Sequence, residues 1–160
     1  MSSVTEPTNA TVTPREPILI CYEDSPDAVR AIEAAAALLG PRRAVVVDVL
    51  PWMTPAESIA ATSSIVPGNA FEALNEAEAR RIADRGAEIA RSAGFEAESR
   101  GQLASLTWQA IVDVADELDV AVIVIGSRGL TGPKKIFDAS LSQQVAEHAG
   151  RPVLIVPPPR

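Results

Sequence analysis

The chain has 160 residues, enough for one domain with a sizeable core and too few for two domains of ordinary size. Hydrophobic residues make up 47% of it but aromatic residues only 4%, a composition typical of buried parallel strands and the helices that cover them. Its 14 basic and 21 acidic residues leave a net charge of −7, which argues against nucleic acid or an anionic membrane as a partner.

The hydropathy of the sequence predicts neither a membrane span nor a signal peptide. No apolar run approaches the roughly 20 residues of a membrane span, and the N-terminus lacks the apolar core of a signal peptide, so we expect a cytoplasmic protein. Residues 1–16 have no periodicity and predict a disordered tail. The domain then spans residues 17–157, and residues 158–160 form a C-terminal tail. The single cysteine, Cys21, excludes an intrachain disulfide, and we expect a buried, inert thiol there.

The first predicted strand is the apolar run 18–22, which ends at the acidic pair Glu23 and Asp24. Ser25 or Asp24 is placed to cap a helix whose first residue is Pro26. Apolar residues recur at helical spacing through this helix, at Val29, Ile32, Ala36 and Leu39. A glycine–proline pair ends it, which completes a strand-turn-helix unit.

The second predicted strand is Ala44–Leu50, in which Asp48 is the one polar residue. The nearly uncharged stretch 51–70 that follows is predicted to lack secondary structure, and is either a lid or binding loop or a plain surface excursion. A helix is predicted for residues 71–93. Its inner face is formed by Ile82, Gly86, Ile89 and Ala93, and its outer face by Glu76, Arg80, Asp84 and Glu88.

The next predicted element is a weak strand at residues 95–102, which we expect at an edge of the sheet because few of its residues are apolar. Ser105 or Thr107 is placed to cap a helix after it. The core residues of that helix are predicted to be Trp108, Ile111, Val112, Ala115 and Leu118. Residues 120–125 form an apolar fourth strand and residues 152–156 a fifth, after which a proline run forbids further pairing.

The fourth strand ends at Gly126, and a second glycine, Gly129, lies in the loop that follows. Ser140 and Gln143 match a capping box, so we expect a helix that begins there and directs its free N–H groups towards the glycine loop. Such N–H groups form a concave, partly positive site that suits a phosphate. The alternative is that the two glycines merely permit a tight corner between strand and helix.

Strands and helices therefore alternate along the chain. With right-handed crossovers this order makes a parallel sheet that is covered on both faces. Ligands of such sheets bind beyond the carboxyl ends of the strands, where the strand order reverses. We expect Glu23 and Asp24, after the first strand, to meet the segment from Gly126 to Gly129 there.

Three stretches of the sequence resemble the universal stress protein family. They are ILICYEDSPDAVRAIEAAAALL at the start, TWQAIVDVADELDVAVIVIGSRG in the middle and GSRGLTGPKKIFDASLSQQVAEHAGRPVLIV at the end. The resemblance covers nearly the whole domain, residues 17–156. We therefore expect a Rossmann-like α/β fold with a doubly wound, five-stranded parallel sheet of strand order 3-2-1-4-5 and helices on both faces.

The resemblance also implies a site for ATP, with Mg²⁺ accompanying it. Nucleotide-binding members carry Gly-x-x-Gly, nine residues, then Gly-Ser or Gly-Thr, which Gly126, Gly129 and Ser140 match. The resemblance implies that Glu23 and the backbone near Val49 contact adenine. The candidate cofactor-binding residues are Tyr22, Glu23, Asp24, Ser25, Val49, Gly126, Ser127, Arg128, Gly129, Gly132, Ala139, Ser140, Leu141 and Ser142.

Four positions depart from the family pattern. Ala139 replaces the third motif glycine, Glu23 replaces an aspartate, Asp24 replaces a glycine, and Asp138 adds a carboxylate beside the proposed phosphate site. Lys134 and Lys135 either offset that charge or form a solvated loop.

No set of catalytic residues and no metal-ligand cluster can be assembled from the sequence, and His148, the one histidine, is expected on a helix surface away from the glycine loop. We therefore expect a stress-response regulatory module that binds an adenine nucleotide and is not an enzyme. The alternatives are a nucleotide-free dimeric member that acts through protein contacts, and a slow ATPase or adenylate-transferring enzyme. The resemblance further implies a homodimer through the final strand, Val153–Val156, and an unidentified protein partner; a monomer is the alternative to the dimer.

Overall fold

The computed structural model describes residues 16–52, 54–63, 68–127 and 139–159. The strands are β1 (Ile18–Cys21), β2 (Arg43–Leu50), β3 (Glu96–Leu103), β4 (Val122–Gly126) and β5 (Val153–Val156). The helices of the described residues are α1 (Pro26–Leu39), α2 (Pro55–Ser63), α3 (Gly68–Ser92), α4 (Thr107–Glu117) and α5 (Ala139–His148). The predicted N-terminal tail lies outside the described residues, except for its last residue.

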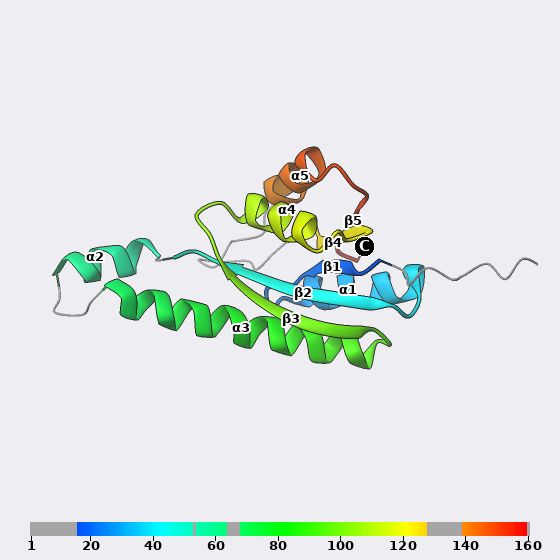
Figure 1. Cartoon of the computed structure of the whole chain (residues 1–160), viewed down its shortest axis with the longest axis horizontal. Helices are drawn as coiled ribbons and strands as arrows, with labels where there is room; N and C mark the ends of the chain where they lie inside the picture. The colour runs from blue at the N-terminus through cyan, green and yellow to red at the C-terminus, as the bar shows by residue number, and fades with distance from the viewer. Residues whose placement is uncertain (1–15, 53, 64–67, 128–138, 160) are drawn as a thin grey trace, which may run out of the picture.

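The strands form one parallel sheet in the order β3-β2-β1-β4-β5, which confirms the predicted fold class and strand order. Figure 1 shows α4 and α5 on one face of this sheet and α1 and α3 on the other. Successive residues of a strand point to opposite faces, and β1 is buried on both. Leu19 and Cys21 pack towards α4 and α5, whereas Ile18, Ile20 and Tyr22 pack towards α1 and α3.

The residues at the start of α1 cap the helix as predicted. The Ser25 side chain accepts a hydrogen bond from the Ala28 amide at 3.0 Å, and Pro26 is the first helical residue. A cap of this kind stabilises a helix by about 1 kcal/mol. Gly40 ends the helix with a φ of 67°, a conformation that glycine adopts without strain.

The stretch 51–70, predicted to lack secondary structure, instead contains α2 and the start of α3, so that prediction was wrong. Thr54 and Glu57 form a reciprocal capping box, in which the Thr54 amide donates to Glu57 Oε2 at 2.6 Å and the Glu57 amide donates to Thr54 Oγ1 at 3.2 Å. The motif Thr-Pro-Ala-Glu is visible in the sequence and could have identified this helix. Figure 1 shows α2 and the first turns of α3 extending beyond the end of the sheet.

Two other predicted caps were wrong. The N-cap of α4 is Leu106, with no side-chain hydrogen bond, so neither Ser105 nor Thr107 fills that role. Helix α5 begins at Ala139, which places Ser140 inside its first turn. Gln143 donates forward to Glu147 at 2.9 Å.

The remaining elements agree with the sequence patterns. The outer residues predicted for α3 are exposed, and β3 is an edge strand. Cys21 is buried as predicted, and burial raises the pKa of its thiol well above the usual range. His148 is exposed on α5, where its ring lies 4.5 Å from the Trp108 ring centre. Among the described helices, none combines the length and the apolar character that crossing a membrane requires.

Candidate functional site

The carboxyl ends of β1, β2 and β4 lie side by side in the sheet. β1 pairs with β2 on one side and with β4 on the other, so the strand order reverses at β1. The Tyr22 amide donates to the Val47 carbonyl at 2.9 Å, which extends the β1–β2 pairing to the start of the acidic turn. The fold thus brings together the predicted residues that follow β1 with the end of β2 and with Gly126, at the place where parallel sheets bind ligands.

Glu23, the predicted adenine contact, is a buried residue in this turn and is 7% exposed. Its Oε1 accepts a short hydrogen bond from the Ser25 hydroxyl, which is the same hydroxyl that caps α1. Burial raises the pKa of Glu23 to about 7, and nearby Asp24 adds to the rise while the Ser25 hydrogen bond opposes it. Glu23 is therefore a fixed acceptor whose charge changes near neutral pH.

The side chain of Asp24 has different partners from that of Glu23. Its Oδ1 accepts from the Tyr22 hydroxyl at 3.0 Å, and its Oδ2 lies 3.3 Å from Nη1 of Arg85 on α3. Its φ of 62° falls in the left-handed region, where glycine is unstrained and aspartate is tolerated. The departure from the family's glycine therefore fits this backbone, and the side chains of Glu23 and Asp24 bind different partners.

Asp48 on β2 is a second buried carboxyl at this end of the sheet, and sequence analysis did not assign it to the site. It is 1% exposed, and its Oδ2 has no hydrogen-bond partner among the described residues. Burial raises the pKa of Asp48 to about 8, with a further contribution from the charge of Glu23. The sequence signal was available, because Asp48 is the one polar residue in an otherwise apolar strand.

Gly126 closes β4 against the first turn of α1. A Cβ built there would lie 3.4 Å from the Asp27 carbonyl oxygen, an ordinary contact distance, and the φ of Gly126 is not in the left-handed region. Neither packing nor backbone conformation therefore demands glycine at this position. This weakens the alternative that Gly126 merely permits a corner. The next residue, Ser127, donates its amide to the Val156 carbonyl at 2.9 Å and so extends the β4–β5 pairing.

The first turn of α5 consists of four predicted site residues, Ala139, Ser140, Leu141 and Ser142. Leu141 and Ser142 are buried. The partial positive charge of a helix N-terminus favours an anion near these residues. The predicted site residues Arg128, Gly129 and Gly132 lie outside the described residues, as do Lys134, Lys135 and Asp138. The described residues contain no group of three or more His, Cys, Asp or Glu side chains placed to hold a metal ion.

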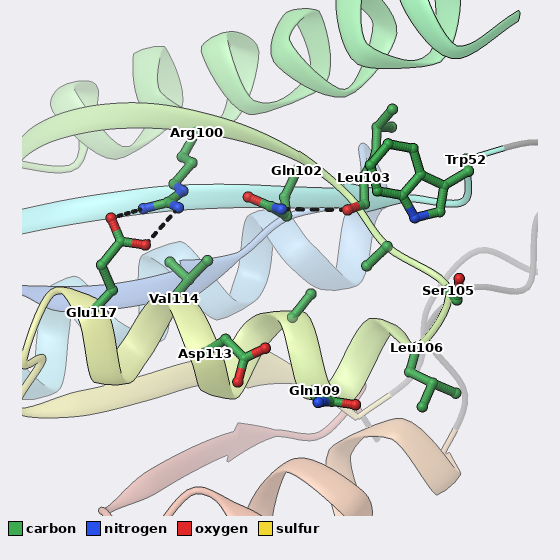
Figure 2. A pocket seen from close by; sticks show the side chains of 12 residues that line it. Trp52, Arg100, Gln102, Leu103, Ser105, Leu106, Gln109, Asp113, Val114 and Glu117 are labelled. Atoms are coloured by element: carbon green, nitrogen blue, oxygen red, sulfur yellow. Dashed lines mark hydrogen bonds and ion pairs between the residues drawn. The ribbon is translucent and has the colours of Figure 1, made fainter. Parts of the chain in front are cut away.

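A hollow of about 390 Å³ lies elsewhere, between the outer edge strand β3 and α4. Figure 2 shows Trp52 at one end and the Arg100–Glu117 ion pair at the other, with Gln109 and Asp113 of α4 along one wall. Sequence analysis did not predict this hollow, because it depends on how β3, α4 and Trp52 pack together.

Comparison with known proteins places the chain among related sequences and structures. The model of the universal stress protein family matches residues 14–157. Universal stress protein YxiE of Bacillus subtilis (strain 168) is 29% identical over 150 residues, which cover 87% of this chain and 97% of that protein.

Two solved structures share the fold. The structure of hypothetical protein MJ0577 has a TM-score of 0.70 and 21% identity, and the match covers 92% of this chain and 99% of that one. The universal stress protein from Archaeoglobus fulgidus in complex with dAMP has a TM-score of 0.58 and 24% identity. This match covers 90% of this chain and 99% of that one.

Proposed function

This chain belongs to the universal stress protein family, and from that premise we propose that it is a stress-response regulatory module that binds an adenine nucleotide at the carboxyl ends of β1 and β4. The observation that carries this proposal is the buried carboxyl of Glu23, which lies where the strand order reverses. The complex of the Archaeoglobus fulgidus relative with dAMP supports the choice of an adenine nucleotide.

In the proposed complex each part of the site has one role. The Glu23 carboxylate accepts a hydrogen bond from the exocyclic amine of adenine, and the backbone of Val49 contacts the base. The ribose lies over Gly126, which presents no side chain, and the first turn of α5 faces the phosphates. ATP with Mg²⁺ is the form that we propose first. The function is regulatory and not catalytic, in the cytoplasm.

Ala139 is compatible with this arrangement as far as its backbone is concerned. It is the first residue of α5, and helical φ and ψ angles are open to alanine. The added methyl group nevertheless departs from the family motif, and this departure favours the second candidate, a nucleotide-free member that acts through protein contacts.

Calorimetric titration of the purified protein with ATP, ADP and AMP, each with and without Mg²⁺, tests the proposal. We expect heat of binding for at least one of them at concentrations up to hundreds of micromolar. Absence of heat for all three contradicts the proposal. Gain of binding in an Ala139→Gly variant then identifies the second candidate, a site that has lost its ligand.

We further propose a homodimer through β5. This strand pairs with β4 and, within the described part of the chain, with no strand on its other side. Ile155 is 39% exposed on this edge, and the other three residues of β5 are partly exposed apolar side chains. An unpaired apolar strand of this kind is stabilised when a second copy covers it. Sedimentation analysis of an Ile155→Glu variant tests this: we expect a dimer for the unaltered chain and a monomer for the variant.

A further inference from the structure

The opposite edge of the sheet, formed by β3, is long and polar. β3 pairs with β2 along its whole length, and within the described ranges no strand pairs with its outer side. The amides of Glu96 and Ala104 donate to carbonyls of the β2 side, at 3.0 and 2.9 Å. The N–H and C=O of one strand residue point to the same side, and alternate residues point to opposite sides. The odd-numbered residues Ala97, Ser99, Gly101 and Leu103 therefore direct their backbone groups to the free edge.

Side chains cover the two ends of this edge but leave its centre open. Arg91 donates to the Ala97 carbonyl at 2.9 Å, and Gln102 donates to the Leu103 carbonyl at 3.3 Å. Between them, Ser99 and Gly101 are half-buried, and no described residue forms a hydrogen bond with their outward backbone groups. The centre of the edge therefore offers donors and acceptors to an additional strand.

The C-terminal half of the edge has a hollow on each face of the sheet. The hollow of about 390 Å³ lies between β3 and α4. Figure 2 shows α4 below β3 in that view and α3 above it. A second hollow, of about 230 Å³, lies against α3. Both are lined by Trp52, Gln102 and Leu103. Because side chains of a strand alternate between the two faces, a strand added to β3 would place successive side chains in the two hollows in turn.

Carboxylates dominate the charged residues of both hollows. Glu72 and Glu76 line the hollow against α3, and Asp113 and Glu117 line the hollow against α4. The one cation that lines them is Arg100, which is bound to both oxygens of Glu117 at 3.0 and 2.8 Å. Glu76 is paired with Arg80 at 3.4 Å, so among the described residues Glu72 and Asp113 are the lining carboxylates without an ion pair.

Asp113 is exposed, and no described residue forms a hydrogen bond or ion pair with it. The apolar part of the lining includes two exposed side chains, Trp52 at 47% and Leu106 at 52%. The site therefore complements side chains that combine positive charge with apolar length.

We propose that the free edge of β3 binds an extended basic segment of another protein, which adds to the sheet as a further strand and places Lys or Arg side chains, alternating with apolar ones, in the two hollows. This partner site is separate from the proposed nucleotide site. Main-chain hydrogen bonds to Ser99 and Gly101 supply the pairing, and the acidic hollows select the sequence.

Peptide binding measured by fluorescence polarisation tests the proposal on the full-length protein. The probe is a labelled, capped peptide in which lysine alternates with valine. We expect saturable binding, a loss of at least about tenfold when glutamate replaces lysine, and a similar loss when alternate backbone amides that face β3 are N-methylated. Absence of binding at millimolar peptide overturns the proposal, and so does equal binding of the N-methylated peptide.

A matched pair of variants tests the same edge from the protein side. Ser99→Pro removes an outward N–H that the β2–β3 ladder does not use, and proline is tolerated at such edge positions. Ser99→Ala is the control, because both variants lose the hydrogen bond from the Ser99 hydroxyl to Asp84. We expect Ser99→Pro to weaken peptide binding by at least about tenfold relative to Ser99→Ala. Thermal unfolding checks that both variants fold, and the N-methylated peptide tests the pairing without altering the protein.

The charge contribution has its own test. Asp113→Lys should weaken binding of the lysine peptide several-fold and strengthen that of the glutamate peptide, since the substitution reverses the one unpaired charge of the larger hollow. Unchanged preference between the two peptides overturns the charge assignment. If Ser99→Pro instead converts an oligomer to a smaller species in sedimentation, the occupant of the edge is a second copy of this chain and the proposal is overturned.

Discussion

The acidic residues at the carboxyl ends of β1 and β2 and those around the edge of β3 are chemically alike but lie in opposite environments. Glu23 and Asp48 are buried, and burial raises the pKa of the two carboxyls to about 7 and about 8, respectively. Asp113 and Glu117 are exposed along α4, where water and salt screen their charges. Burial turns an acid into a group that changes charge near neutral pH. Exposure leaves it suited to attracting a partner.

Replacing Asp48 should give the largest effect, because it removes a carboxyl that the folded protein prefers to keep neutral. A raised pKa means that the folded state binds the proton more tightly than the unfolded state. The contribution of Asp48 to the free energy of unfolding is therefore largest below about pH 4. It decreases by up to about 1.4 kcal/mol per pH unit as the pH rises to about 8. We expect Asp48→Asn to be more stable than the unaltered protein at pH 8, by on the order of 2 kcal/mol.

Urea unfolding of both proteins at pH 5 and pH 8 measures this difference. The stabilisation should shrink markedly at pH 5, where the unaltered carboxyl is protonated in the folded state. Asp113→Asn makes the same chemical change at an exposed position and is the matched control, with an expected change within about 0.5 kcal/mol at either pH. Loss of stability in Asp48→Asn at pH 8 would show that the charged carboxyl has a stabilising partner.

Replacing Glu23 should give an intermediate effect, on ligand affinity. If the carboxylate accepts a hydrogen bond from adenine, affinity rises with pH as Glu23 loses its proton around pH 7. Glu23→Gln keeps the size of the side chain and a carbonyl acceptor but removes the charge. We expect the variant to bind the nucleotide roughly tenfold more weakly than the unaltered protein at pH 8, which is the typical effect of losing a charge-assisted hydrogen bond. The affinity of the variant should not change between pH 6 and pH 8.

Titration calorimetry with ATP at several pH values makes this measurement. The matching inosine nucleotide, which lacks the exocyclic amine, is the ligand control and should bind the unaltered protein less tightly. Identical pH profiles for the unaltered protein and Glu23→Gln would remove Glu23 from the role of adenine acceptor.

Breaking the Arg100–Glu117 pair should give the smallest effect on stability. The pair is bidentate, and Arg100 holds the pKa of the Glu117 carboxyl below its usual range through its hydrogen bonds and charge. Exposed pairs of this kind seldom contribute measurably to folding. We expect Glu117→Gln to unfold at the same urea concentration as the unaltered protein. A clear loss of stability would show that the pair holds β3 against α4.

Sequence patterns predicted most of the fold because they report local preferences. The burial of β1, the Ser25 cap and the edge position of β3 all follow from the residues of the elements themselves. Helix α2 was missed although its capping motif, Thr54 to Glu57, is local, because the weakly patterned composition of the segment outweighed that signal. The predicted cap at Ser140 failed because a matching motif does not determine which residue starts a helix.

Composition and periodicity thus determined that this chain forms a covered parallel sheet, and spaced glycines with an acidic turn indicated where its ligand site lies. Tertiary structure alone decided that Asp48 has no hydrogen-bond partner among the described residues, that Asp24 faces Arg85, and that acidic hollows flank the edge of β3. The physical reason is that periodicity depends on neighbours along the chain. The charge state and partners of a side chain depend on residues that only folding brings near.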